Sequence, residues 1–441
     1  MSTTLPPGTR DTLPRELVER EAQTPPAVAP APARPVSLPP RERLLSLDVF
    51  RGMTVAGMLL VNNPGSWGAI YPPLEHAEWH GWTPTDLIFP FFLFIVGITT
   101  HLSLSTRRAR GDDEGAIVRQ ILRRGALIFL FGLILNAFPF YQWGPPASWG
   151  FAGDPRSADP GVWERIVWRF EHLRIMGVLQ RIGLAYTLSA LLTLRTTLRQ
   201  QVTIIAALLL GYWLAMTLLP VPDTGYLGAL VLDRPGATLD AWLDRVLLTP
   251  SHLWIGGGGV RDPEGLFSTI PAVCTAMLGV LAGRWIGTAR PIHERLSGLF
   301  AGGALAMMVG LMWHWSFPIN KSLWTSSYVL FTAGMACVAL GTCMWIIDVH
   351  RVTGWTKPFV IYGVNPMIAF LGSGLMARYI YSIQKVEYHG RQTALETAIY
   401  QSAFASWLEP RNASLAFALT FVLVWLAILW VLYRKNIVLK V

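Results

Sequence analysis

One short stretch of the chain holds most of the side chains that could carry out chemistry. It contains His76 and His80 together with the acids Glu75, Glu78 and Asp86. Because an unperturbed imidazole has a pKa of about 6.5, a histidine beside a carboxylate can serve as a general base or a nucleophile. Any of the three acids could orient such an imidazole, as a third group does in a catalytic triad. The two histidines could also bind a metal, but no third ligand stands out, and an aromatic belt with polar loop residues is the plainer alternative.

A second pair of reactive residues lies in the apolar segment before this loop. Asp48 and Arg51 are three residues apart, so on a helix they share one face and can form an ion pair. Charges inside a membrane-spanning segment are costly and indicate function by default, and a guanidinium suits a phosphate-bearing ligand. The sequence leaves both interpretations open, a structural ion pair and an anion-binding Arg51.

Asn62 stands at the other end of the same segment. Roughly 14 helical residues, or about 21 Å, separate Asp48 from Asn62. We therefore expect the ion pair and the histidine loop near opposite faces of a membrane, where only a long, thin ligand reaches both.

The elements that position these residues are long apolar helices. Hydrophobic residues make up 52% of the 441 residues and charged residues only 14%, against about 25% charge in a soluble domain. This composition excludes a typical cytosolic enzyme, a disordered protein and a coiled coil. It predicts an all-α, polytopic integral membrane helical bundle with about ten transmembrane helices, at roughly 44–62, 85–105, 120–138, 173–194, 201–219, 268–287, 296–314, 325–347, 358–377 and 414–433.

The distribution of basic residues predicts the orientation of this bundle. If the N-terminus is cytoplasmic and ten helices follow, most of the 36 Lys and Arg residues fall on the cytoplasmic side, which favours N-in and C-in. The net charge of +9 does not indicate nucleic acid as a partner, because the basic residues form short clusters between apolar runs rather than a stripe on a helix face.

The remaining segments are a tail and long loops. Residues 1–40 are rich in proline and lack an apolar core, so we expect a disordered cytoplasmic tail before a transmembrane domain at 41–441. An amphipathic stretch at 392–408 could lie in the membrane interface. The long loops could form a lid or vestibule, or merely cap the bundle. They are expected on the external side at about 139–172, 220–267 and 378–413.

A series of short motifs runs along the chain in a fixed order. They are RLLSLDVFRG at 43–52, HAEWHGWT at 76–83, DLIFP at 86–90, LRIMGVLQRIG at 173–183, DPEGLFSTI at 262–270, NKSLWT at 320–325 and PFVIYGVNP at 358–366. In this order they resemble the heparan-α-glucosaminide N-acetyltransferase family, which includes a lysosomal enzyme and bacterial relatives. The resemblance covers about residues 41–441.

The resemblance implies a transmembrane N-acetyltransferase that moves an acetyl group from cytosolic acetyl-CoA to the amine of a glucosamine-type sugar at the external face. It implies that His76 is catalytic, as a general base or as an acetyl acceptor, and that Asn62 matches the family's asparagine and could stabilise the oxyanion. The charged end of acetyl-CoA would lie towards Arg51. The family also suggests a homodimer, no metal and, for this chain, the bacterial inner (plasma) membrane.

Further polar residues in these motifs are candidates for binding the two substrates. Arg181, next to Gln180, either contacts CoA or pairs with a carboxylate. Asp262 and Glu264 either receive the cation and hydroxyls of the amino sugar or cap the following helix. The complete set of expected binding residues is Asp48, Arg51, Asp86, Gln180, Arg181, Asp262, Glu264, Lys321 and Asn365.

The last two of these residues also have structural interpretations. Lys321, close to Trp324, could anchor the external interface, and Asn365, beside Pro366, could be a packing residue at a helix kink. Two other functions fit the same features, a transporter for amino sugars or other solutes and an acyltransferase acting on a cell-envelope glycan. Uptake without acetyl-CoA, and profiling of donors and acceptors, distinguish them.

Overall fold

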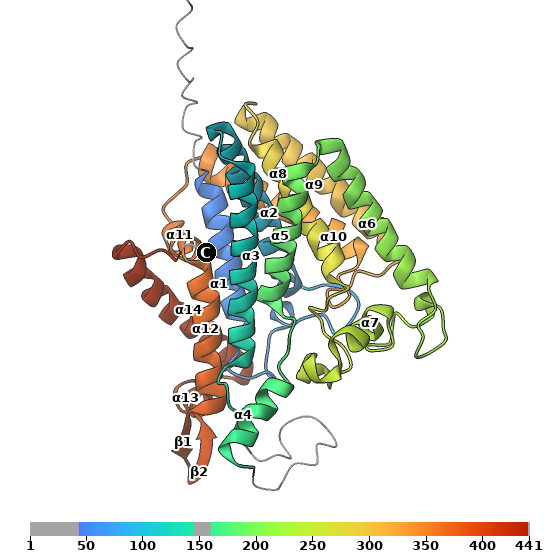
Figure 1. Ribbon diagram of the computed structural model, residues 1–441. Coiled ribbons are helices and arrows are strands. Elements are labelled where there is room, and N and C mark those ends of the chain that lie inside the picture. Colours follow the sequence, from blue (N-terminus) through green and yellow to red (C-terminus); the bar gives the residue numbers. More distant parts are fainter. Residues whose placement is uncertain (1–43, 145–159, 440–441) are drawn as a thin grey trace, which may run out of the picture. The chain divides into compact units, whose positions relative to one another are not determined.

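The computed structural model of the chain describes residues 44–144 and 160–439 and is built almost entirely from helices (Figure 1). The region from Leu44 onwards forms one structural unit. The predicted tail at 1–40 lies outside the described residues. The predicted class, a polytopic helical membrane protein, is confirmed.

Within the described residues, seven helices are long and apolar enough to cross a membrane. They fall where the hydropathy of the sequence predicts them, because each is a run of about 20 apolar residues. They are α1 (Leu45–Asn62), α2 (Ile88–Arg110), α6 (Leu198–Leu218), α8 (Thr269–Ile286), α9 (Ile292–His314), α10 (Ser326–Met344) and α14 (Pro410–Arg434).

An eighth span depends on a pair of helices that meet at a sharp bend. α11 (Lys357–Val364) and α12 (Pro366–Arg378) are bent by 83° at Asn365, so the span predicted at 358–377 is broken at the position where a kink beside Pro366 is expected. Pro366 supplies the physical reason, because a proline has no N–H to donate and its ring clashes with the preceding turn.

Two further predicted spans form helices but are not among the seven. α3 (Glu114–Ala137) and α5 (Val178–Arg195) are long enough, yet α3 carries three arginines in its first half and α5 carries Arg181 within it. These charges lower the hydropathy of both helices, so the described residues give seven or eight candidate spans rather than ten.

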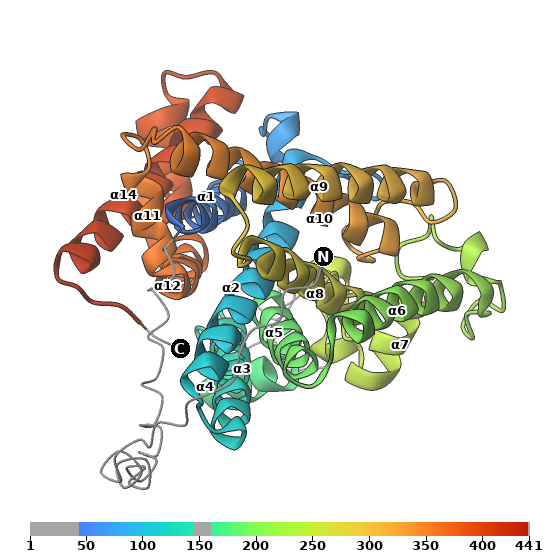
Figure 2. The same ribbon diagram turned by 90° about the horizontal axis from the view of Figure 1, so that it is seen from above.

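The central helices approach each other through glycines. A Cβ on Gly97 of α2 would lie 1.9 Å from the Ala276 carbonyl oxygen of α8, and a Cβ on Gly279 of α8 would lie 2.0 Å from the Phe94 oxygen of α2. Only glycine permits such contact between backbones, as is common in membrane bundles. Figure 2 shows α2 and α8 crossing near the middle of the bundle. Of the seven spans, α9, α14 and α6 are the least buried.

The long loops gather at one end of the bundle (Figure 1). They contain α4 (Val162–Glu171), α7 (Leu239–Leu248) and α13 (Leu395–Tyr400). An antiparallel hairpin of β1 (Lys385–Tyr388) and β2 (Arg391–Ala394) pairs Lys385 with Ala394, so the stretch predicted as amphipathic at 392–408 begins as a strand. Short 3-10 and π turns complete the fold: η2 (Pro72–Leu74), η3 (Pro84–Leu87), η5 (Gly228–Leu230), η6 (Pro250–His252), η7 (Ile255–Gly257), η8 (Trp345–Val349), η9 (Tyr379–Ile383) and η10 (Gln401–Ala405).

Candidate active site

The candidate site is built on the turn that leads into α2. Thr83 and Asp86 form a capping box at the start of η3. The Oδ2 atom of Asp86 accepts hydrogen bonds from the backbone N–H groups of Thr83 and Ala77, each at 3.0 Å. A carboxylate at this position satisfies N–H groups that have no partner within the helix. The same bonds hold the segment that carries His76 against the start of the helix.

His76 pairs with Asp86 rather than with either neighbouring glutamate. The Nδ1 atom of His76 lies 2.7 Å from Oδ1 of Asp86. An ionised carboxylate only accepts hydrogen bonds, so Nδ1 carries the proton and Nε2 keeps its lone pair. The Asp86 side chain is 1% exposed, whereas that of His76 is 45% exposed. A buried acid therefore orients an accessible imidazole.

Lys321 is the third member of this cluster and comes from the turn between α9 and α10. Its Nζ lies 3.0 Å from Nδ1 and 3.2 Å from Nε2 of His76, and 3.6 Å from Oδ1 of Asp86. Burial lowers the pKa of Lys321 below its ordinary value, although Asp86 and Glu264 act in the opposite direction. Lys321 therefore lies beside the imidazole and is not simply an interface anchor.

These three residues open into a cavity of about 330 Å³. Its charged lining combines acids with bases, and its aromatic lining consists of Trp79 and Trp254. The Arg261 guanidinium lies over the Trp79 ring, 4.9 Å from its centroid. Such a mixture of flat apolar faces and polar groups of both signs fits a small polar ligand. The lining residues are His76, Ala77, Glu78, Trp79, Asp86, Trp254, Arg261, Pro263, Glu264, Lys321 and Ser322.

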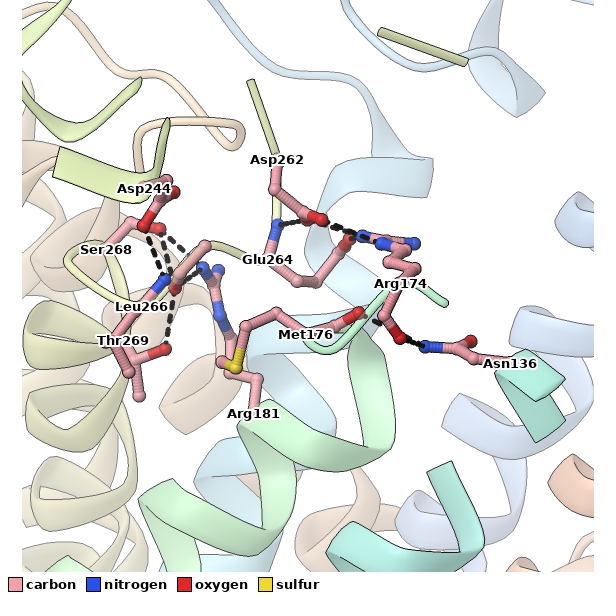
Figure 3. Close-up of polar contacts among 11 residues, drawn as sticks. Asn136, Arg174, Met176, Arg181, Asp244, Asp262, Glu264, Leu266, Ser268 and Thr269 are labelled. Atoms are coloured by element: carbon pink, nitrogen blue, oxygen red, sulfur yellow. Dashed lines mark hydrogen bonds and ion pairs between the residues drawn. The ribbon is translucent and has the colours of Figure 1, made fainter. Parts of the chain in front are cut away.

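Asp262 and Glu264 are both ion-paired with Arg174 (Figure 3). Nε and Nη2 of Arg174 lie 2.8 and 2.5 Å from the two Asp262 oxygens, and Nη2 lies 2.5 Å from Oε2 of Glu264. Burial disfavours the charges, but the two carboxylates raise the pKa of Arg174, and Arg174 lowers that of Glu264. Four residues separate Glu264 from the start of α8 at Thr269, and Asp262 lies further away, so neither acid caps this helix. Only Glu264 reaches the cavity.

Arg174 was not among the predicted site residues. It lies two positions into the motif at 173–183, where Arg181 drew attention because it falls inside an apolar helix. The signal that could have found it is the pair of acids at 262 and 264, which need a cation when buried.

Arg181 and Gln180 are buried away from the cavity lining. Nη2 of Arg181 donates to the Gly265 carbonyl at 3.0 Å and to Oγ of Ser268 at 2.5 Å (Figure 3). Its guanidinium also lies 5.1 Å from the centroid of the Trp324 ring. Arg181 thus holds α5 to the segment that leads into α8, while Gln180 packs closely against Gly132 of α3.

The structure does not bring the other predicted residues into this cavity. Asn62 is exposed at the end of α1, and it is the neighbouring Asn63 that is buried. At the opposite end of α1, Arg51 pairs with Asp48 at 2.7 Å and donates to the Gly363 carbonyl at 2.8 Å. The ion pair predicted from their spacing is confirmed.

Asn365 has a structural role at the bend between α11 and α12. Its Nδ2 donates to the Ile437 carbonyl at 2.9 Å, and its Oδ1 accepts from the Leu439 N–H at 3.1 Å. Both ends of this buried amide are used to hold a distant segment of backbone, which is the packing role considered above.

His80 belongs to a different pair from His76. Its Nε2 lies 2.8 Å from Oδ1 of Asp233. In residues 44–144 and 160–439, no group of three or more His, Cys, Asp or Glu side chains is placed to hold a metal ion. His80 therefore offers a matched comparison for His76, since both are loop histidines that contact one carboxylate.

Comparison with known proteins agrees with the motif order in the sequence. Residues 43–256 match the family model described as heparan-alpha-glucosaminide N-acetyltransferase, catalytic. Human heparan-alpha-glucosaminide N-acetyltransferase is 29% identical over 467 residues, covering 94% of the chain and 62% of the human protein. The mouse protein of the same name is 30% identical over 393 residues, covering 76% of the chain and 54% of the mouse protein. The chain spans less than two thirds of the length of either relative.

Proposed function

Since the chain belongs to the heparan-alpha-glucosaminide N-acetyltransferase catalytic family, we propose that it is a membrane-embedded N-acetyltransferase. The donor is acetyl-CoA and the acceptor is the amine of a glucosamine-type sugar. The observation that carries this proposal is the buried Asp86 that orients the accessible His76 at the edge of a cavity.

The chemistry uses the Nε2 atom of His76. The amine nitrogen forms a bond to the acetyl carbon, the thioester C–S bond breaks, and Nε2 takes the ammonium proton and returns it to the departing thiolate. A second route through the same atom transfers the acetyl group to Nε2 first and then to the amine. In both routes Asp86 stabilises the positive charge that develops on the imidazole. Trapping of acetylated protein after acid quenching distinguishes the routes.

Lys321 and the carboxylates of the cavity have separate roles, Lys321 towards the thioester oxygen and the carboxylates towards the acceptor sugar. The Lys321 ammonium, 3.2 Å from Nε2, is close enough to donate to the oxyanion that forms when the thioester is attacked. Glu78 and Glu264 supply acceptors for the hydroxyl and ammonium groups of an amino sugar, and Trp79 and Trp254 supply flat faces for its ring. Asn62 lies outside this lining, so we assign the oxyanion contact to Lys321 instead.

We propose that this cavity faces the exterior and that acetyl-CoA approaches from the cytoplasm. The support is the charge distribution, since the short connections at the opposite end of the bundle carry many of the arginines. Arg51 lies at that opposite end of α1, beside the bend between α11 and α12. The proposed location is the inner membrane of a bacterium.

The test is acetyl transfer from labelled acetyl-CoA to a panel of glucosamine-type and cell-envelope glycan acceptors by purified protein in detergent. Transfer should be lost in His76→Ala and should stay within a few fold of wild type in His80→Ala, which removes the matched loop histidine. Full transfer by folded His76→Ala contradicts the proposed role. No transfer by wild type, combined with solute uptake into proteoliposomes without acetyl-CoA, supports a transporter instead.

A further inference from the structure

A second, larger cavity lies at the long-loop end of the bundle and shares no lining residue with the His76 cavity. Its volume is about 690 Å³, and it is lined by residues of α4, the end of α12, η9, the start of β1 and the segment that follows α3. The residues that matter for its chemistry are the cations Arg169, Arg378 and Lys385 and the aromatics Tyr141, Trp143 and Tyr381.

The charge of this cavity is positive and is not balanced by acids. Its lining contains Arg169, Arg378 and Lys385 but no aspartate or glutamate among the described residues. Like charges that share a partly buried space repel each other, so an anion in this cavity would be stabilised by all three. Burial also lowers the pKa of Arg169, which agrees with a cation that has lost water without gaining a carboxylate.

Backbone carbonyls hold the two guanidinium groups in place. Nη2 and Nε of Arg169 donate to the carbonyls of Asn136 at 2.5 Å and Ala137 at 3.2 Å. Nη1 of Arg378 donates to the carbonyls of Leu135 and of Phe138 in the same stretch of chain. These bonds to the carbonyls at the end of α3 fix the orientation of both groups, and a neutral carbonyl leaves the net charge of each guanidinium in place.

The position of the cavity indicates where its ligand comes from. It lies at the ends of long helices, where α12 and η9 leave the apolar region, and Trp143 and Tyr379 are among the exposed aromatics there. Aromatic and basic side chains together are typical of the membrane interface. The planar donors of arginine match the oxygens of a phosphate group.

From these observations we propose that this cavity binds a phosphate-type oxyanion, carried by an anionic lipid headgroup or by a soluble phosphate. Nothing in this assignment depends on the acetyl-transfer proposal. Lys385 is the residue that tests it best, because it is exposed and its side chain has no hydrogen bond within the described part of the chain. Its charge can be reversed with little risk to the fold.

The experiment measures binding of three probes to the purified full chain in a neutral detergent: inorganic phosphate, dihexanoyl-phosphatidylglycerol and dihexanoyl-phosphatidylcholine. We expect saturable binding of phosphatidylglycerol or of phosphate that weakens with added salt. Lys385→Glu should bind about tenfold more weakly, the loss of one charge-assisted contact. Arg391→Glu, the same charge change on the neighbouring strand, should bind like wild type.

The outcomes distinguish a lipid headgroup from a soluble phosphate as the ligand, and some of them contradict the proposal. Saturable binding of phosphatidylglycerol without phosphate identifies a lipid site, and binding of both identifies a general phosphate site. Equal, salt-independent binding of phosphatidylcholine, or equal effects of Lys385→Glu and Arg391→Glu, contradicts an anion site. If Lys385→Glu does not fold, binding is measured for Lys385→Gln instead. Weaker binding by Lys385→Gln and a loss of wild-type binding with added salt then support the anion site, and the absence of both contradicts it.

Discussion

Replacing Asp86 by asparagine separates the two roles of this side chain, capping the helix start and orienting the histidine. An asparagine oxygen can still accept from the N–H groups of Thr83 and Ala77, which now bind Oδ2 of Asp86. Its NH₂ group then faces Nδ1 of His76, where the carboxylate oxygen lies at 2.7 Å. Nδ1 must become an acceptor, so the proton moves to Nε2 and the reactive lone pair is lost.

The effect of Asp86→Asn on kcat should be large and its effect on stability small, so the orienting role and the capping role can be separated. Inverting the tautomer of a triad histidine lowers kcat by about 10⁴-fold, and we expect a loss of about 10³–10⁴-fold in Asp86→Asn. The free energy of unfolding should fall by only about 1–2 kcal/mol, because the backbone bonds are kept. Asp86→Ala should lose the cap as well and be less stable than Asp86→Asn.

The assay is steady-state acetyl transfer, with a thermal unfolding curve for each variant. Glu78→Gln is the matched control, since it makes the same carboxylate-to-amide change in the lining of the same cavity. It should raise KM for the acceptor and leave kcat nearly unchanged. A folded Asp86→Asn protein with kcat within tenfold of wild type would refute the argument that Asp86 sets the tautomer of His76.

Three further predictions follow from the surrounding charges. Lys321→Gln should lower kcat by about 10²-fold, the usual effect of losing one oxyanion donor, and Lys321→Arg should recover part of it in the same transfer assay. Arg174→Gln should lower the free energy of unfolding by about 3–5 kcal/mol, measured by thermal unfolding, because Asp262 and Glu264 are left without their partner. The stability of Arg174→Lys should lie between that of wild type and that of Arg174→Gln. Burial and Asp240 raise the pKa of Asp244 from 3.8 to about 7, so its ionisation opposes folding increasingly between about pH 4 and pH 7. Asp244→Asn should therefore raise the unfolding temperature more at pH 8 than at pH 5.

Hydropathy predicted the helices well because it reports a local property of the sequence. Both α3 and α5 form where they were expected, but their arginines lower the hydropathy of both helices, and neither is among the candidate spans. Pro366 predicts a kink or break in this helix but not the angle of 83°, since the size of a bend depends on what packs against it.

The sequence predicted His76, at the centre of the candidate site, but not which residues contact it. The motif order pointed to His76, and the sequence offered three acids as its partner. Choosing Asp86 required the path of the loop, which the capping bonds determine. Lys321 is 245 residues from His76 along the chain, and Arg174 is 88 residues from Asp262. Contacts over such separations depend on the tertiary structure, so no local pattern reveals them.

The buried amide of Asn365 has a consequence for the order in which the protein assembles. Its two partners are 72 and 74 residues further along the chain, beyond α14. During synthesis, Asn365 reaches the membrane well before Ile437 and Leu439 exist, and a buried polar group without partners is costly in lipid. The corner between α11 and α12 therefore gains these partners only after α14 has been made and the residues that follow it fold back onto the bend.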